Sequence, residues 1–84
     1  MEELKVLKKK ARSLNPIIRI GKSGITDNII SEIKKQLKLR HLIKVKFLKS
    51  FVDSSDKHEA VEKIVTDTTA KLIERKGNTL VIYK

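Results

Sequence analysis

The chain has 84 residues, and its 20 Lys and Arg outnumber its 10 Asp and Glu to give a formal net charge of +10. It has no cysteine and only two histidines, which excludes disulfides and zinc sites of ordinary ligand spacing. No apolar stretch approaches the roughly 18 residues of a membrane span, and no signal-peptide core opens the chain. We therefore expect one small cytoplasmic domain over residues 1–84, with no metal, no cofactor and no membrane partner.

The positive charge is unevenly distributed along the chain. Residues 1–50 hold 14 Lys and Arg and 4 Asp and Glu, whereas residues 51–84 hold 6 of each kind. The whole excess therefore lies in the first part of the chain. This asymmetry favours a face that binds a polyanion, above all a nucleic acid. The alternative is a lysine-rich, solvated helix surface of the kind found in proteins adapted to heat.

The first predicted helix covers residues 3–14. Its apolar residues recur at i, i+3, i+7 and i+10 and form one stripe, which consists of Leu4, Leu7, Ala11 and Leu14. Asn15-Pro16 should end this helix, because the residue before a proline avoids the α region. Residues 17–20 (Ile-Ile-Arg-Ile) then predict a short buried strand.

A second helix is expected to run from a cap at Thr26 or Asp27 to about Leu39. Its buried stripe would consist of Ile29, Ile30, Ile33 and Leu37. Residues 42–48 are rich in apolar and β-branched side chains and predict a strand. Because side chains alternate along a strand, one face would carry Ile43, Val45 and Phe47, and the other Lys44 and Lys46.

A polar loop is predicted at residues 49–55, after which Ser54 or Ser55 can cap a third helix over residues 56–69. The apolar stripe of that helix would consist of Ala60, Val61, Ile64, Val65 and Thr68. Its outward side chains are mostly acidic. This helix is therefore expected to form the acidic side of the molecule.

Two strands are predicted at residues 70–75 and 79–83, on either side of the hairpin-turn signal Gly77-Asn78. The expected order of elements is α-β-α-β-α-β-β. Helices that alternate with strands predict a layered α/β domain with a four-stranded mixed sheet. The final hairpin would supply an antiparallel pair of strands.

Nothing in the sequence assembles a catalytic acid, a base and an oxyanion donor. There is no cysteine nucleophile and no Gly-x-Ser-x-Gly elbow. His41 follows the second helix and His58 lies near the start of the third, where each is expected to be a surface or capping residue. We therefore expect no enzyme and no small-molecule substrate.

The segment Gly21-Lys22-Ser23-Gly24 lies between the first predicted strand and the second predicted helix. Glycine lets a backbone approach a phosphodiester closely, and a helix start presents free N–H groups to an anion. A Walker loop requires an upstream glycine and a dinucleotide fingerprint a third glycine, and neither is present. The segment is a candidate phosphate-binding loop. A plain strand-to-helix turn that needs glycine for positive φ is the alternative.

Three segments of the chain run from Leu7 to Thr26, from Glu32 to Lys46 and from Gly77 to Lys84. In this order they resemble the CRM domain family (chloroplast RNA splicing and ribosome maturation), in its stand-alone YhbY-like form. The resemblance implies a fold similar to the C-terminal domain of translation initiation factor three. It also implies RNA binding through a Gly-x-x-Gly loop analogous to that of KH domains. Because stand-alone bacterial members are associated with precursors of the large ribosomal subunit, it further implies ribosomal RNA as the partner.

Two positions depart from the pattern of that family. A histidine that is usual shortly before the first strand corresponds to Arg12, which keeps hydrogen-bond donors but has no aromatic ring. A glycine that is frequent near the end of the third helix corresponds to Thr69.

The residues expected to contact RNA belong to the loop, the first helix, the first two strands and the C-terminus, with Lys44, Lys46 and Lys84 implied by the resemblance. They are Gly21, Lys22, Ser23, Gly24, Lys8, Lys9, Arg12, Arg19, Lys44, Lys46 and Lys84. Phosphates and RNA shape should dominate binding, with little direct reading of sequence. Base stacking is disfavoured, because Phe47 and Phe51 are expected in the core and Tyr83 alone is left open.

The expected partner is thus RNA, in particular ribosomal RNA or a pre-ribosomal particle, bound by a monomeric chain during assembly of the large ribosomal subunit. Two other functions use the same positive face. One is a DNA-binding architectural protein, and the other is a basic module that docks acidic proteins.

Overall fold

The computed structural model describes residues 3–84. Along these residues the elements are α1 (Leu4–Ala11), β1 (Ile18–Ile20), α2 (Asp27–Arg40), β2 (Leu42–Phe47), α3 (Lys49–Val52), α4 (Lys57–Thr68), β3 (Lys71–Lys76) and β4 (Thr79–Tyr83). The α/β class and the four-stranded mixed sheet that the sequence predicts are confirmed. No helix in residues 3–84 is long and apolar enough to cross a membrane.

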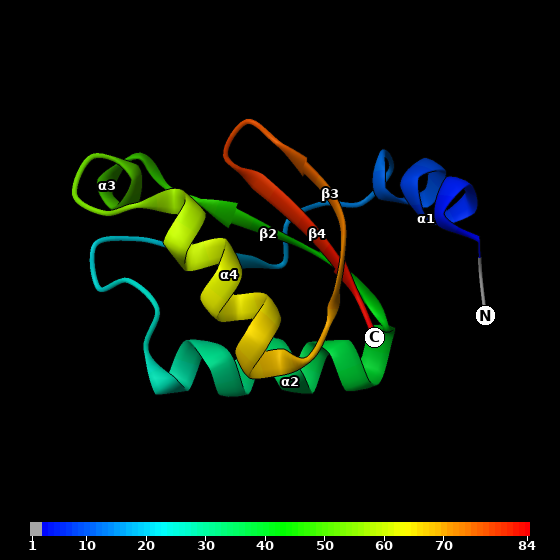
Figure 1. The fold of residues 1–84 in the computed structure, drawn as a ribbon, viewed down its shortest axis with the longest axis horizontal. Coiled ribbons are helices and arrows are strands. Elements are labelled where there is room, and N and C mark those ends of the chain that lie inside the picture. Colours follow the sequence, from blue (N-terminus) through cyan, green and yellow to red (C-terminus); the bar gives the residue numbers. More distant parts are fainter. Residues whose placement is uncertain (1–2) are drawn as a thin grey trace.

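The sheet has the strand order β1-β2-β4-β3. β4 is antiparallel to both β2 and β3 (Figure 1). β1 runs parallel to β2. β1 and β2 therefore end at the same edge of the sheet, where the Leu48 N–H donates to the Ile20 carbonyl at 2.8 Å. β4 begins at this edge, because Lys46 is the register partner of Thr79.

One face of the sheet is covered by α2 and α4 and holds the main core (Figure 1). β2 supplies Ile43, Val45 and Phe47 to it, each at most 1 % exposed, as its alternation predicts. Phe47 stacks on Phe51, with ring centroids 5.2 Å apart. Both phenylalanines are therefore core residues, as expected from the sequence.

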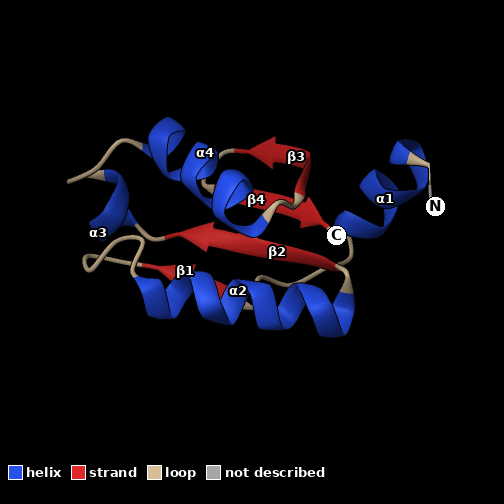
Figure 2. Ribbon diagram, turned by 60° about the horizontal axis from the view of Figure 1, so that its bottom comes forward, coloured by secondary structure: helices blue, strands red, loops and turns tan. Residues whose placement is uncertain are grey.

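The other face of the sheet is covered in part by α1. In Figure 2, α1 lies at one end of the sheet, apart from α2 and α4. Leu7 and Ala11 of α1 pack on Ile73 of β3 and Val81 of β4. Half-buried Leu42 and Tyr83 border this second, smaller cluster. We call the face that α1 covers the α1 face; its portion nearest the ends of β1 and β2 carries polar and charged side chains.

Two predictions around residue 50 are wrong. The predicted loop 49–55 begins with the short helix α3, whose only buried residue is Phe51. Four residues with one apolar anchor are too few to give a helical period. The cap of α4 is Asp56 rather than Ser54 or Ser55, and its carboxylate accepts hydrogen bonds from the N–H groups of His58 and Glu59.

The first helix and strand are shorter and more exposed than predicted. α1 ends at Ala11, after which Ser13 and Leu14 donate their N–H groups to carbonyls three residues earlier, in a tight turn. Leu4 belongs to the predicted apolar stripe but is 48 % exposed. In β1 only Ile18 and Ile20 are buried and Arg19 points outward, because β1 is an edge strand with one face on the core.

Candidate nucleic-acid interface

A row of three cationic residues crosses the α1 face of the sheet near the ends of β1 and β2. Arg19 is the register partner of Lys46, Lys46 that of Thr79, and Thr79 that of Lys76. The row therefore runs through all four strands in the order Arg19, Lys46, Thr79, Lys76. Since neighbouring strands lie about 4.8 Å apart, Arg19 and Lys46 are direct neighbours, and Lys76 lies two strands beyond Lys46.

The charges of this cationic row are not compensated. Arg19, Lys46 and Lys76 are exposed, and no side chain of the three makes an ion pair with any residue in 3–84. Like charges directly opposite each other in a sheet are destabilising. The domain thus keeps an arrangement that costs stability unless an anion binds there.

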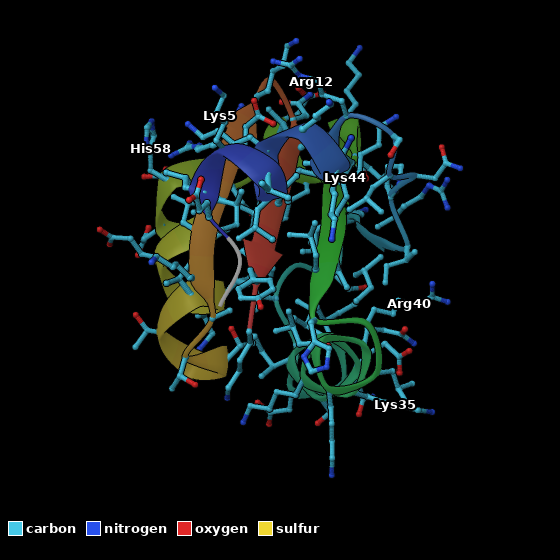
Figure 3. The ribbon with its side chains drawn as sticks, turned by 90° about the vertical axis from the view of Figure 1, so that its right-hand side faces the viewer. Lys5, Arg12, Lys35, Arg40, Lys44 and His58 are labelled. Carbon is cyan, nitrogen blue, oxygen red and sulfur yellow. The ribbon has the colours of Figure 1, made fainter. Side chains whose placement is uncertain are left out.

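The cationic row continues into a hollow of about 340 Å³ beneath the end of α1. Arg12, Lys44 and Lys76 line this hollow together with one acid, Glu74. Figure 3 shows Arg12 and Lys44 on the side of the molecule that α1 occupies, and Lys35 on the opposite side. Three cations against one carboxylate leave the hollow positively charged.

The Gly21–Gly24 segment forms a tight turn directly after β1. The Gly24 N–H donates to the Gly21 carbonyl at 2.9 Å, and Gly24 has φ +74°, a conformation that side chains other than glycine rarely adopt. At Gly21 an added Cβ would only reach van der Waals contact, 3.4 Å from side-chain atoms of Leu48 and Ser50. Gly24 therefore has a structural reason of its own, as in the turn that the sequence left as the alternative, whereas the space around Gly21 does not demand glycine.

Lys22 and Ser23 at the tip of the turn are exposed, and their backbone N–H groups make no hydrogen bond with residues 3–84. They are free to meet an anion. The start of α2 is less available, because the Thr26 hydroxyl accepts the Ile29 N–H and Asp27 places a carboxylate in the first turn. Asp27 already interacts favourably with the helix dipole and would repel a phosphate bound there.

The predicted contact residues divide into two groups in space. α1, which carries Lys8 and Lys9, lies at one end of the longest dimension of the molecule, and the Gly21–Gly24 turn lies at the other (Figures 1 and 2). That dimension is 35 Å. The cationic row and the hollow with Arg12 and Lys44 lie on the sheet between them. One extended ligand, rather than a compact one, could reach both groups.

Lys84 has a different environment from the other predicted contacts. Its ammonium donates to the Thr68 carbonyl at the end of α4, and its backbone N–H donates to the His41 carbonyl. His41 caps α2 with φ +67° and donates its N–H to the Leu37 carbonyl, as a capping histidine should. Lys84 therefore ties two helix ends together, and its contact with a ligand stays a prediction.

Lys76 was missed by reasoning from the sequence. It belongs to the second half of the chain, in which positive and negative residues are equal in number. Only the hairpin register, which pairs Lys76 with Thr79 around Gly77-Asn78, places it in the same row as Lys46, on the far side of β4. Counting outward from that turn signal could have found it.

The model of the CRS1/YhbY (CRM) domain family matches residues 1–84, the whole chain. The chain belongs to this family. The resemblance inferred from the three segments is therefore confirmed. The backbone at Thr69 accounts for the glycine that is frequent at this position of the CRM domain. Thr69 adopts the left-handed conformation (φ +56°, ψ +21°), which suits glycine.

Similar proteins carry names that refer to RNA. The chain is 37 % identical over 83 residues to the probable RNA-binding protein YqeI of Bacillus subtilis (strain 168), covering 99 % of this chain and 84 % of that protein. It is 35 % identical over 78 residues to a protein of Haemophilus influenzae named RNA-binding protein, covering 93 % of this chain and 77 % of that protein.

A solved structure has the same fold. The solution structure of SAV1595 from Staphylococcus aureus, described as a candidate RNA-binding protein, superposes with a TM-score of 0.77 at 37 % identity. The match covers 96 % of this chain and 82 % of that one.

Proposed function

We propose that this CRM domain binds structured RNA through its phosphate backbone, along the α1 face of the sheet. The observation that carries the proposal is the uncompensated cationic row of Arg19, Lys46 and Lys76. The free N–H groups of Lys22 and Ser23 extend the same surface at the edge of the sheet. The names of the relatives support RNA over other polyanions.

The finer proposal is that the ligand is ribosomal RNA and that the chain acts, as a cytoplasmic monomer, during assembly of the large ribosomal subunit. Within it, Gly21–Gly24 works like the loop of a KH domain, on a fold akin to the C-terminal domain of translation initiation factor three. The experiment for the ligand is crosslinking of the protein in its own cells and sequencing of the bound RNA. Precursor ribosomal RNA should dominate, and a broad sample of messenger RNA would contradict this assignment.

Binding should depend strongly on salt. If the face neutralises about five phosphates, log K should fall against log salt concentration with a slope of about −3 to −4. A folded RNA hairpin titrated at several salt concentrations measures that slope. Affinity that stays the same between low and moderate salt would overturn the phosphate-led mechanism.

The two other functions predict different competitors. An architectural DNA-binding protein would lose its bound RNA to duplex DNA of equal length at equal concentration, whereas an RNA-binding domain should retain it. A module that docks acidic proteins would keep its partner after nuclease treatment. Neither alternative is needed to account for the cationic row. The proposed function is binding and not catalysis.

A further inference from the structure

A second hollow opens on the α1 face, at the end of the sheet away from the Gly21–Gly24 turn. Its volume is about 490 Å³, within the range of about 300–1,000 Å³ typical of small-ligand sites. Its walls come from the connection between α1 and β1 and from the end of α2. The start of β2 and the end of β4, which pair with each other, complete them. The residues that line it include Asn15, Arg40, His41, Lys44 and Tyr83.

Several polar groups around this hollow have no partner within residues 3–84. The Tyr83 hydroxyl and the Asn15 side-chain amide make no hydrogen bond. His41 uses only Nδ1, which lies 3.3 Å from the Lys84 carbonyl, so its Nε2 is free. These groups can donate to and accept from the edge of a planar heterocycle.

His41 and Tyr83 both bring an aromatic ring to the hollow, and that of Tyr83 is the larger. The Tyr83 ring is half-buried against the cluster of Leu7, Ala11, Ile73 and Val81, so that its position is fixed by packing. Tyr83 also lines the hollow. A fixed ring with one accessible side can serve as a platform for a stacked base.

Cations connect the hollow to the cationic row. Lys44 lines both this hollow and the one beneath the end of α1 that also contains Lys76. Arg40 at the end of α2 also lines the hollow; its Nε donates to the Gln36 side-chain oxygen, and its terminal nitrogens make no further bond with residues 3–84. A phosphate chain that follows the row would therefore reach the hollow at Lys44.

We propose that this hollow takes one unpaired nucleotide of the bound RNA, with its base stacked on Tyr83 and its phosphates held by Lys44 and Arg40. The inference rests on the proposed function and adds a preference to it. RNA with an extruded base next to a paired stem would bind better than the stem alone. Asn15 and His41 Nε2 would then meet the edge of that base.

The test compares two RNA hairpins, one fully paired and one with a single unpaired uridine, under identical salt. The wild-type domain should bind the bulged hairpin about tenfold more tightly. Tyr83→Leu keeps an apolar side chain at the packing site but removes the ring, and should abolish this difference. Tyr83→Phe keeps the ring and should retain most of it.

A second readout does not depend on any variant. The chain has one tyrosine and no tryptophan, so its tyrosine fluorescence reports on Tyr83 alone. Stacking should quench this emission with the bulged hairpin and much less with the paired one. Equal affinities for the two hairpins, or a bulge preference that survives Tyr83→Leu, would overturn the site while leaving RNA binding intact. Failure of both hairpins to bind would instead overturn the proposed function, and this site with it.

Discussion

The two faces of the sheet differ most clearly along β2, where adjacent residues have opposite surroundings. Val45 and Phe47 are buried in the core beneath α2 and α4, whereas Lys46 between them lies in an uncompensated cationic row. Burial of apolar surface stabilises the first face, and like-charge repulsion costs stability on the second. The two faces of β2 thus have different roles. Residues that stabilise the fold alternate along the strand with residues that are available to a ligand.

The largest expected effect lies on the core face. Phe47→Ala should lower the free energy of unfolding by about 3–5 kcal/mol, because it leaves a cavity where the stacked Phe47–Phe51 pair was. Against a typical total of about 5–15 kcal/mol, this is a large part of the stability. Urea unfolding followed by circular dichroism measures it. A loss below about 1 kcal/mol would mean that β2 does not organise the core.

Lys46→Glu tests the other face of the same strand. It should weaken binding to an RNA hairpin by about tenfold at 0.1 M salt and reduce the salt slope by about one, since one phosphate contact is lost. Its stability should remain within about 0.5 kcal/mol of wild type, because the residue is exposed and its removal relieves repulsion with Arg19.

Lys35→Glu is the matched control, with the same change of charge on the exposed side of α2, away from α1 (Figure 3). Its effect on RNA affinity should be less than about twofold at moderate salt, where charges beyond about 10 Å are screened. Equal losses in the two variants would mean that net charge, rather than the row, determines binding.

The sequence was sufficient for the two faces of β2, because the alternation of Ile43, Val45 and Phe47 with lysines is a local pattern. It was not sufficient for the cationic row, since Lys76 joins Lys46 only through pairing across β4. The charge counts even favoured the opposite conclusion for Lys76, because residues 51–84 hold equal numbers of positive and negative side chains. Tyr83 is similar: a shortage of aromatic residues disfavoured stacking, but one ring at the edge of a hollow is a matter of tertiary position.

Thr69→Gly tests the end of a helix that covers the core face of the sheet. Thr69 ends α4 in the left-handed region, where a β-branched residue costs about 1–2 kcal/mol of stability. Glycine removes this strain, but it also increases the conformational entropy of the unfolded chain, which cancels part of the gain. The free energy of unfolding should rise by about 0.5–1 kcal/mol, with RNA affinity unchanged. Thr66→Gly, in the last turn of α4, should instead lower it by a few tenths of a kcal/mol. A destabilised Thr69→Gly variant would show that the Thr69 hydroxyl bond to the Thr68 carbonyl outweighs the strain.

The smallest effect is expected at the tip of the Gly21–Gly24 turn, and it decides how much this turn contributes beside the cationic row. Lys22 is exposed and has no side-chain partner in residues 3–84. An exposed and mobile charge contributes less than about 1 kcal/mol, so Lys22→Glu should weaken RNA binding only about threefold, without a change in urea unfolding.

The same filter-binding assay that measures Lys46→Glu provides the comparison. A loss for Lys22→Glu larger than that for Lys46→Glu would make the turn the main phosphate clamp and the row its accessory. No loss at all would leave the turn as a structural feature, in which Gly24 is needed for its positive φ. The intermediate result is expected, because the free N–H groups of Lys22 and Ser23 persist when the lysine side chain is replaced.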